Sequence, residues 1–415
     1  MKEEMEMSKK LFVDLGLLRR NRDFRSVFIA RTISLLGLGM LSVAVPMQVY
    51  ALTGDSLQVG LALALEGGGM FAGLLLGGVL ADRYDRRRLI LLARAICGLG
   101  FVGLAANAWL PAPSLWAVCL LSAWDGFFGA LGVTALLACM PAIVGRENLM
   151  QARAISMVSM RLATVISPAI GGVLIAAAGV GWAYAIAAIG TGLTLLPLLR
   201  LPAMLPQHAG DEHPLRALVD GVRFLSTSPV LAATVLVGTL VTLTTAVRVL
   251  FPAMAPGALE LGLMYSAVSL GATLGAVVSG WTEHLQRPGR AMIVASLAAF
   301  ACLMLLGVQP AFPFVPALLA CFGYCVSIAS LLQYGLVQGH TPDHYLGRVN
   351  GLWAAQDAAG DSLATIGIGL LGKLLSATAG IFVLGATAGV LGLAMFGLCK
   401  RLRNVPLNDP ALHAV

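Results

Sequence analysis

Charged side chains are scarce in this sequence. Asp, Glu, Lys and Arg together account for 11% of the 415 residues, whereas 58% are hydrophobic, and soluble domains carry about 25% charged residues. So small a charged fraction excludes a soluble globular fold. The hydrophobic residues are gathered into repeated runs that are long enough to cross a lipid bilayer as helices.

Residues for several kinds of chemistry are also missing. The seven cysteines all fall in apolar runs without CxxC spacing, and the six histidines all lie in the polar segments between or after those runs. Neither a disulfide framework nor a metal site is therefore predicted. No P-loop, HExxH, GxSxG or dinucleotide-binding motif occurs. The sequence predicts no enzyme, no catalytic residue and no cofactor, and it leaves an ion gradient as the energy source for any active process.

Twelve runs have the length of a membrane span. Scanning for runs of ~17–25 residues with few charges predicts an all-α membrane protein whose twelve transmembrane helices form two six-helix bundles. The first run is too long for a signal peptide and is interpreted as an uncleaved span. The predicted spans are 26–50, 58–81, 89–110, 114–144, 155–178, 182–199, 230–254, 259–281, 291–308, 314–338, 349–375 and 379–399.

Basic residues lie on one side of these spans. Of the 27 Lys and Arg residues, 22 fall in the N-terminal segment, the even-numbered connections and the tail. Lys and Arg near the ends of spans are retained in the cytoplasm, so both termini are predicted to be cytoplasmic. Topology thereby accounts for the net charge of +7, and the lipid bilayer rather than a nucleic acid is the predicted partner.

Composition divides the chain into five segments. The stretch 200–229 is polar and rich in proline, which is typical of a linker. The predicted organisation is a cytoplasmic segment (1–25), a first bundle (26–199), a linker (200–229), a second bundle (230–399) and a cytoplasmic tail (400–415), with Met7 as an alternative start to Met1. The basic connection 82–88 recurs at 283–290. Paired halves of this kind are typical of transporters that bind a small molecule near the bilayer midplane.

The connection between spans two and three carries a recognisable signature. It reads Gly78-Val79-Leu80-Ala81-Asp82-Arg83-Tyr84-Asp85-Arg86-Arg87-Arg88 and resembles the loop motif of the major facilitator superfamily, except that Asp85 stands where that family usually has glycine. The resemblance implies a gating role for Gly78, Asp82, Arg83, Arg86 and Arg87, with Gly78 allowing close helix approach. The alternative is an ordinary topology-fixing basic loop, which accounts for the arginines but not for the spacing of Gly and Asp.

Span five contains a second motif of this kind. Its Ser167-Pro168-Ala169-Ile170-Gly171-Gly172 resembles the proline–glycine motif of the antiporter branch of the superfamily. The resemblance implies a gating role for Pro168, Gly171 and Gly172. The alternative is a packing role, in which small residues bring helices close together around a proline kink.

A narrower resemblance covers nearly the whole chain. The segments Trp124-Asp125-Gly126-Phe127-Phe128, Gly145-Arg146-Glu147-Asn148 and Leu346-Gly347-Arg348-Val349-Asn350, among others, are similar to the enterobactin exporters of Gram-negative bacteria. This resemblance implies a multi-pass protein of the inner membrane that serves iron homeostasis. It implies export of a catecholate siderophore from cytoplasm to periplasm, driven by the proton gradient, with an outer-membrane efflux channel as a downstream partner.

Several ionisable residues lie inside the predicted spans, where each costs roughly 2.5–3.5 kcal/mol on insertion scales. Arg31, Arg94 and Arg248 lie near span ends, so membrane anchoring is an alternative to a functional role. Deeper groups need a wet cavity or a partner. We expect proton-coupling roles for Glu66, Asp125 and Asp361, and for Asp357, which lies on the same helix face as Asp361 and could share its proton. The alternative is a buried ion pair, for example between Asp125 and Arg161.

Aromatic, amide and basic side chains toward span centres suit a flat polar ligand such as a catechol. The arginines would attract ionised catechol oxygens, and the rings would stack. Packing against lipid is the alternative for each ring. The predicted substrate-binding residues are Arg31, Arg161, Arg248, Trp124, Phe127, Tyr265, Gln333, Tyr334, Trp353 and Gln356.

Two other functions share most of these features. A broad-specificity drug/proton antiporter would have the same spans, signature and intramembrane charges. A non-transporting membrane sensor or scaffold built on the same fold is the second alternative.

Overall fold

The structure is a computed structural model that describes residues 16–145, 147–202, 204, 229–309 and 311–405. Within its helices the side chains of 82, 137, 138, 343–348, 350–352, 354, 355 and 358 are not described. The described helices of the first half are α2 (Gly16–Arg20), α3 (Arg22–Thr53), α4 (Ser56–Arg83), α5 (Arg86–Ala108), α6 (Leu115–Val144), α7 (Leu149–Ala178) and α8 (Val180–Leu198).

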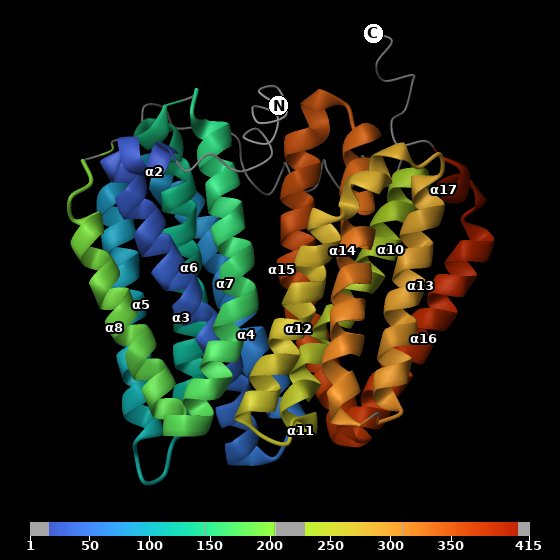
Figure 1. The fold of residues 1–415 in the computed structure, drawn as a ribbon, viewed down its shortest axis with the longest axis horizontal. Helices are drawn as coiled ribbons and strands as arrows, with labels where there is room; N and C mark the ends of the chain where they lie inside the picture. The colour runs from blue at the N-terminus through green and yellow to red at the C-terminus, as the bar shows by residue number, and fades with distance from the viewer. Residues whose placement is uncertain (1–15, 146, 203, 205–228, 310, 406–415) are drawn as a thin grey trace, which may run out of the picture. The chain divides into compact units, whose positions relative to one another are not determined.

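The second half contains six long helices and several short ones (Figure 1). They are α10 (Pro229–Thr245), η1 (Ala246–Leu250), α11 (Phe251–Met254), α12 (Ala258–Val277), η2 (Ser279–His284), α13 (Pro288–Gly307), η3 (Phe312–Phe314), α14 (Val315–Gly339), α15 (Asp343–Leu374), α16 (Ala377–Leu398) and α17 (Lys400–Asn404), where η marks a 3₁₀ helix.

The predicted twelve spans correspond to twelve long helices. Eleven described helices are long and apolar enough to cross a membrane. The twelfth, α15, has 32 residues and carries Asp357 and Asp361, which lower its hydropathy. The all-α membrane architecture is therefore confirmed. Several helices run past the predicted span ends, as α7 does by starting at Leu149, because backbone hydrogen bonding continues where hydropathy stops.

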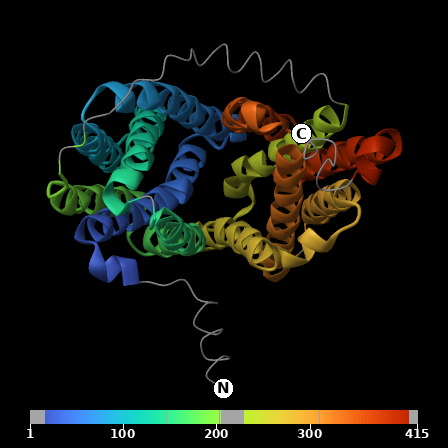
Figure 2. The ribbon, with the colours of Figure 1, turned by 90° about the horizontal axis from the view of Figure 1, so that it is seen from above.

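The contacts between Cα atoms divide the chain into two compact units. Unit 1 comprises 1–45 and 69–210, and unit 2 comprises 46–68 and 211–415. One boundary falls at Pro46 inside α3, where the missing N–H removes a helical hydrogen bond. Figure 2 shows the helices of each unit from above. Most of the predicted linker 200–229, together with Met1, Met7, Arg146 and the last ten residues, lies outside the described residues.

Glycines bring α4 and α6 together in unit 1. A Cβ at Gly69, Gly73 or Gly77 would overlap the α6 backbone or the Thr134 hydroxyl, whereas a Cβ at Gly78 would meet nothing within 4 Å. The expectation that Gly78 allows close helix approach is therefore wrong. The spacing of four residues places the other three glycines on one face of α4, toward α6, and leaves Gly78 on a different face.

The proline–glycine motif of α7 packs against α3, also in unit 1. Pro168, Gly171 and Gly172 are buried. A Cβ at Gly171 would lie 3.0 Å from the Cα of Met40, and a Cβ at Gly39 would overlap Ser167. These contacts are those expected of the packing role.

In unit 2, small residues join the first half of α4 to the second half of α15. A Cβ at Gly60 would overlap the Thr365 carbonyl, and one at Gly369 would lie 2.7 Å from the Ser56 carbonyl oxygen.

At the end of this contact Lys373 donates a hydrogen bond to the Asp55 carboxylate over 2.7 Å. Asp55 lies between α3 and α4, outside the spans. Partial burial raises the pKa of its carboxyl, but hydrogen bonds from Lys373 and the Leu57 N–H, with the Lys373 charge, outweigh that effect and hold the pKa below its ordinary value.

Candidate functional site

Two clusters of polar side chains lie within the helices, one in each unit. The Asp125 cluster consists of Arg94, Cys97 and Asp125 in unit 1. The Arg248 cluster consists of Glu66, Arg248, Tyr265 and Asp361 in unit 2.

The Asp125 cluster lies between α5 and α6, which pack along each other. Asp125 is 3% exposed, and the Cys97 thiol donates to its Oδ1 over 2.8 Å. Arg94, 8% exposed, lies one helical turn before Cys97 on α5 and interacts electrostatically with the same carboxylate. The expected alternative of an Asp125–Arg161 ion pair is therefore wrong, because α5 rather than α7 supplies the partners of Asp125.

Aromatic rings flank this cluster on α6. Trp124 is 43% exposed, and its indole N–H donates to the Ile96 carbonyl over 2.9 Å. The Phe128 ring lies 4.7 Å from the Trp124 ring and 5.0 Å from the Phe127 ring, measured between centroids. The backbone of Phe127 is held against Gly69 and Gly73. The α4–α6 glycine contact therefore fixes the helix that presents both Asp125 and these rings.

Two predicted substrate arginines also belong to unit 1. Arg31 is half-buried on α3, and its charge acts on that of Arg94. Arg161 is half-buried on α7, and its backbone carbonyl accepts a hydrogen bond from the Thr164 hydroxyl.

In the Arg248 cluster, one guanidinium faces two carboxylates. Arg248 forms an ion pair with Asp361 of α15 at 2.5 Å and interacts electrostatically with Glu66 of α4. Tyr265 of α12 donates to the Arg248 carbonyl over 3.0 Å. The expected alternative, in which Arg248 only anchors a span end, is wrong because its charge is directed to Asp361.

Local sequence explains how Arg248 reaches this position. The predicted span 230–254 is not one helix: it changes from α10 to the 3₁₀ segment η1 at Ala246. Pro252 cannot donate to the carbonyl four residues earlier, which is that of Arg248. That carbonyl instead accepts hydrogen bonds from the Phe251 N–H and the Tyr265 hydroxyl.

Other predicted residues of unit 2 connect α15 to its neighbours. The Thr242 hydroxyl donates to Asp357 over 3.3 Å, the Trp353 side chain is hydrogen-bonded to Asp357, and Gln356 donates to Thr239 over 2.6 Å. The rings of Tyr334 and Trp353 lie 5.4 Å apart. Asp357 and Asp361 thus have separate hydrogen-bond partners and also interact electrostatically with each other, and the sharing of one proton stays a prediction.

Gln333 of α14 is buried against α10. Its side chain is 5% exposed, and a Cβ at Gly238 of α10 would overlap its amide. The amide therefore fills the place that a side chain at Gly238 would take.

The basic loop signature is built into the end of unit 1. Asp85 caps α5 by accepting from the Arg87 N–H and, over 3.0 Å, from the Met204 N–H. Its φ of −57° requires no glycine. Arg86 donates to the Ala81 carbonyl and Arg87 to the Leu199 carbonyl. Arg83 is exposed, and the side chain of Asp82 lies outside the described part of the chain.

Sequence reasoning missed two members of the Asp125 cluster and one contact of the loop. By position Arg94 lies near a span end, Cys97 lies in an apolar run, and Asp85 departs from the family motif. The spacing of Arg94 and Cys97, three residues apart on one helix face, was the available signal for the first two.

Among the residues that the structure describes, no group of three or more His, Cys, Asp or Glu side chains is placed to hold a metal ion.

Comparisons with known proteins place this geometry in context. The model of the Major Facilitator Superfamily matches residues 27–365. The chain is 48% identical to the enterobactin exporter EntS of Escherichia coli O1:K1 / APEC over 406 residues, which cover 97% of this chain and 98% of that protein. Among solved structures, it resembles the nucleoside transporter NupG with a TM-score of 0.73 at 14% identity, covering 91% of this chain and 99% of the other. It also resembles a POT family transporter in complex with 5-aminolevulinic acid, with a TM-score of 0.72 at 14% identity and coverage of 92% and 97%. At these low identities the structural likeness shows the fold alone.

Proposed function

The chain belongs to the major facilitator superfamily, and from that premise we propose that it exports a siderophore, an enterobactin-like catecholate, from the cytoplasm to the periplasm. The observation that carries the proposal is the 48% identity to an enterobactin exporter over 97% of the chain. The identity extends through both units and is not confined to a topology motif. The protein is a multi-pass protein of the inner membrane and acts as a transporter without catalysing a reaction.

Alternating access requires two bundles that bind the substrate near the bilayer midplane. We keep residues 26–199 and 230–399 as the proposed bundles, joined by the linker 200–229. The rings of Trp124 and Phe127 in unit 1, and those of Tyr334, Trp353 and Tyr265 in unit 2, are the proposed stacking groups. Gln356, Arg31 and Arg161 are the proposed polar groups, and Gln333 is not among them because its side chain is buried against α10.

We propose that the Arg248 cluster couples export to the proton gradient. One guanidinium can neutralise one carboxylate, whereas Glu66 and Asp361 both interact with Arg248. With both acids ionised these two carboxylates carry one unit of charge more than the guanidinium, and such an excess charge is costly inside a membrane protein. Binding of one proton by either acid removes that charge.

The same cluster gives protons and substrate a common partner. A catechol hydroxyl that donated a hydrogen bond to the ionised carboxylate of Asp361 or Glu66 would be displaced when that carboxylate took up a proton, so proton and substrate would occupy the cluster in turn. Exchange of this kind is antiport. Asp125, held by Arg94 and the neutral Cys97 thiol, is the proposed second proton site, and Asp357 is a third candidate.

The loop signature (Gly78, Asp82, Arg83, Arg86 and Arg87) and the α7 motif (Pro168, Gly171 and Gly172) remain proposals as gating elements. Of these, Arg86 and Arg87 are supported by their hydrogen bonds to the ends of α4 and α8. An outer-membrane efflux channel is the proposed partner that carries the siderophore onward.

The test is complementation in a strain that makes enterobactin but lacks its exporter. Wild-type protein should lower the intracellular catecholate and raise the amount in the medium, measured by chromatography. Resistance to unrelated cationic drugs without siderophore secretion would favour the drug/proton antiporter. Absence of any ligand-dependent proton flux in proteoliposomes would favour the non-transporting sensor.

The proton role has its own test in proteoliposomes with an imposed pH gradient. We expect Glu66→Gln, Asp125→Asn and Asp361→Asn to impair gradient-driven transport, whereas Glu283→Gln, an exposed acid of η2, leaves it unchanged. Full gradient-driven transport by all three amide variants would contradict proton coupling at these sites but would leave siderophore export intact.

A further inference from the structure

Unit 1 contains two adjacent cavities that the proposed transport residues do not use. The polar cavity, of about 530 Å³, is lined by Leu17, Arg20, Asn21, Arg22, Asn148 and Gln151. The apolar groove, of about 440 Å³, lies between α3 and α7 and is lined by Leu18, Phe28, Thr32, Leu36, Ile155, Val158, Ser159, Leu162, Ala163 and Ile166. Their lining residues are neighbours at two places: Leu17 of the polar cavity precedes Leu18 of the groove, and on α7 one helical turn separates Gln151 from Ile155.

The polar cavity is suited to an anion. The amide of Asn21 is already engaged, because it donates to the Ile143 carbonyl and accepts from the Phe24 N–H. The amide of Asn148 donates to the Val144 carbonyl and to the exposed Glu147. Arg20 and Arg22 are exposed, and neither guanidinium has a hydrogen bond or ion pair within the described residues. They are the groups that an external ligand would meet.

The apolar groove offers no polar anchor. Its two hydroxyl groups, those of Thr32 and Ser159, are hydrogen-bonded to each other at 2.8 Å, and Thr32 also contacts the Phe28 carbonyl at 2.9 Å. The other eight lining residues are hydrocarbon or aromatic. A polar siderophore would lose its hydration there without compensation, whereas an acyl chain would lose nothing.

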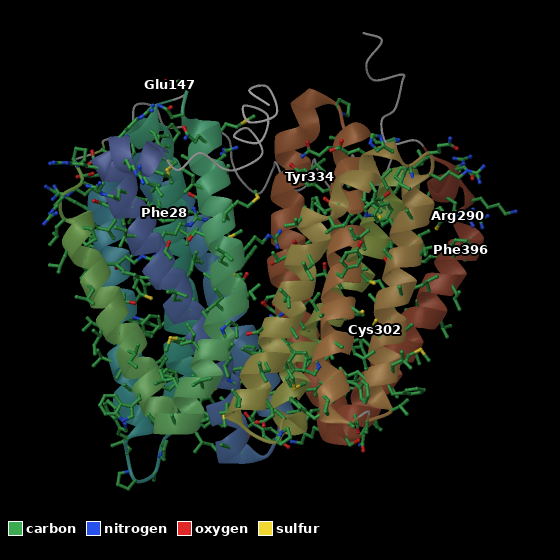
Figure 3. All side chains as sticks on the ribbon, viewed as in Figure 1. Phe28, Glu147, Arg290, Cys302, Tyr334 and Phe396 are labelled. Carbon is green, nitrogen blue, oxygen red and sulfur yellow. The ribbon has the colours of Figure 1, made fainter. Side chains whose placement is uncertain are left out.

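The dimensions of the groove match one leaflet of a bilayer. From Ile155 to Ile166 it follows α7 for about 16 Å at 1.5 Å per residue, and half of a hydrocarbon core of ~30 Å is ~15 Å. On α7 the polar cavity lies one helical turn before this path, at Gln151, and Arg20 and Arg22 line it. In Figure 3, Phe28 on α3 lies below Glu147, which marks the end of unit 1 where α6 and α7 are joined.

We propose that the polar cavity and the apolar groove together bind one anionic phospholipid of the inner leaflet. Its phosphate lies between Arg20 and Arg22, and one acyl chain lies along the α3–α7 groove. The sign of the charge selects the headgroup, and the neighbouring lining residues of the polar cavity and the apolar groove favour a lipid over a free anion. Basic pockets between helices on the cytoplasmic side bind such headgroups in other membrane proteins.

The test uses purified full-length protein in a neutral detergent. Dioleoyl-phosphatidylglycerol, dioleoyl-phosphatidylcholine or inorganic phosphate is titrated, and binding is followed by native mass spectrometry and by the shift in Tm. Three variants are compared with the wild type: Arg20→Gln/Arg22→Gln in the polar cavity, Val158→Trp in the groove, and the control Arg19→Gln/Arg25→Gln, which removes two exposed arginines that line neither cavity.

We expect phosphatidylglycerol to bind the wild type and to raise its Tm. Binding should weaken by about tenfold or more in Arg20→Gln/Arg22→Gln, should also weaken in Val158→Trp, and should change less than about twofold in the control. Equal weakening in both arginine pairs would mean a diffuse charge effect and would overturn the proposal. Protection by inorganic phosphate alone, or displacement of the lipid by a catecholate, would also overturn it.

Discussion

Gly73 and Gly78 lie on the same helix, yet the structure predicts opposite sensitivity to the same substitution. A Cβ at Gly73 would overlap the Phe127 carbonyl oxygen and lie 2.9 Å from the carbonyl carbon, whereas a Cβ at Gly78 meets nothing within 4 Å. Carbon atoms pack best at about 3.5–4.0 Å. Gly73→Ala therefore requires α4 and α6 to separate by roughly 1 Å or more, the shortfall of the closest contact from that packing distance.

Overpacking of this kind costs about 1–3 kcal/mol. Both substitutions gain the same helix propensity, about 0.5–1 kcal/mol for Gly→Ala, so that gain cancels when the two variants are compared. Gly73→Ala should be less stable than Gly78→Ala by about 1–3 kcal/mol, which is a change of roughly 5-fold to 150-fold in the unfolding equilibrium constant.

The assay is reversible unfolding in mixed micelles with increasing dodecyl sulfate, followed by tryptophan fluorescence. Gly67→Ala and Gly68→Ala form a second matched pair, because a Cβ at Gly67 would overlap the Ser362 hydroxyl and one at Gly68 meets nothing within 4 Å. If Gly78→Ala proved as damaging to stability as Gly73→Ala, the account of the α4–α6 contact would be refuted.

Three further predictions concern polar contacts. Cys97→Val removes the hydrogen bond to the buried Asp125 carboxylate and should cost about 1–3 kcal/mol of unfolding free energy, whereas Cys97→Ser should cost less; equal stability of the two variants in the same unfolding assay would contradict this role. Arg248→Met leaves the carboxylate of Asp361 without its partner and should cost about 1–3 kcal/mol, between the values for exposed and buried pairs; the double variant Arg248→Met/Asp361→Asn should recover part of that loss, and no recovery would count against the pairing. The pKa of Asp55 is held below its ordinary value, so its stabilising contribution is present above about pH 4 and is lost as the pH falls through the lowered pKa. The difference in unfolding free energy between wild type and Asp55→Asn should therefore be present at pH 7 and vanish in strong acid. A difference that did not depend on pH would exclude this ion pair as its source.

The sequence was sufficient for the fold because the bilayer imposes one length and one polarity on every span. Twelve apolar runs and a one-sided distribution of basic residues allow few other architectures. The one span that hydropathy describes poorly, α15, is the one that carries Asp357 and Asp361. Its polarity reflects the partners that those acids find on α10 and η1, and hydropathy contains no information about partners.

The sites could be predicted only in part, because a list of charged positions does not contain their contacts. Depth in a span identifies Asp125 as a candidate, but the ion-pair partner considered for it as an alternative is Arg161, whereas the structure gives Arg94 and Cys97. The loop motif points to Gly78 as the residue of close helix approach, but the four-residue spacing places Gly69, Gly73 and Gly77 against α6 instead. The superfamily usually has glycine at the position of Asp85, yet the Asp85 carboxylate caps α5 and accepts a hydrogen bond from the Met204 N–H. In each case the deciding information was a neighbour distant in sequence.

The change from α10 to η1 has a mechanical consequence. A 3₁₀ helix rises about 2.0 Å and turns about 120° per residue, against about 1.5 Å and 100° in an α-helix. If the five residues of η1 wound into α-helix, the segment would become about 2.5 Å shorter and its C-terminal end would rotate by about 100° relative to α10. Arg248 is the middle residue of η1. A change of winding confined to these five residues would therefore move the Arg248 charge around the helix axis without moving α10.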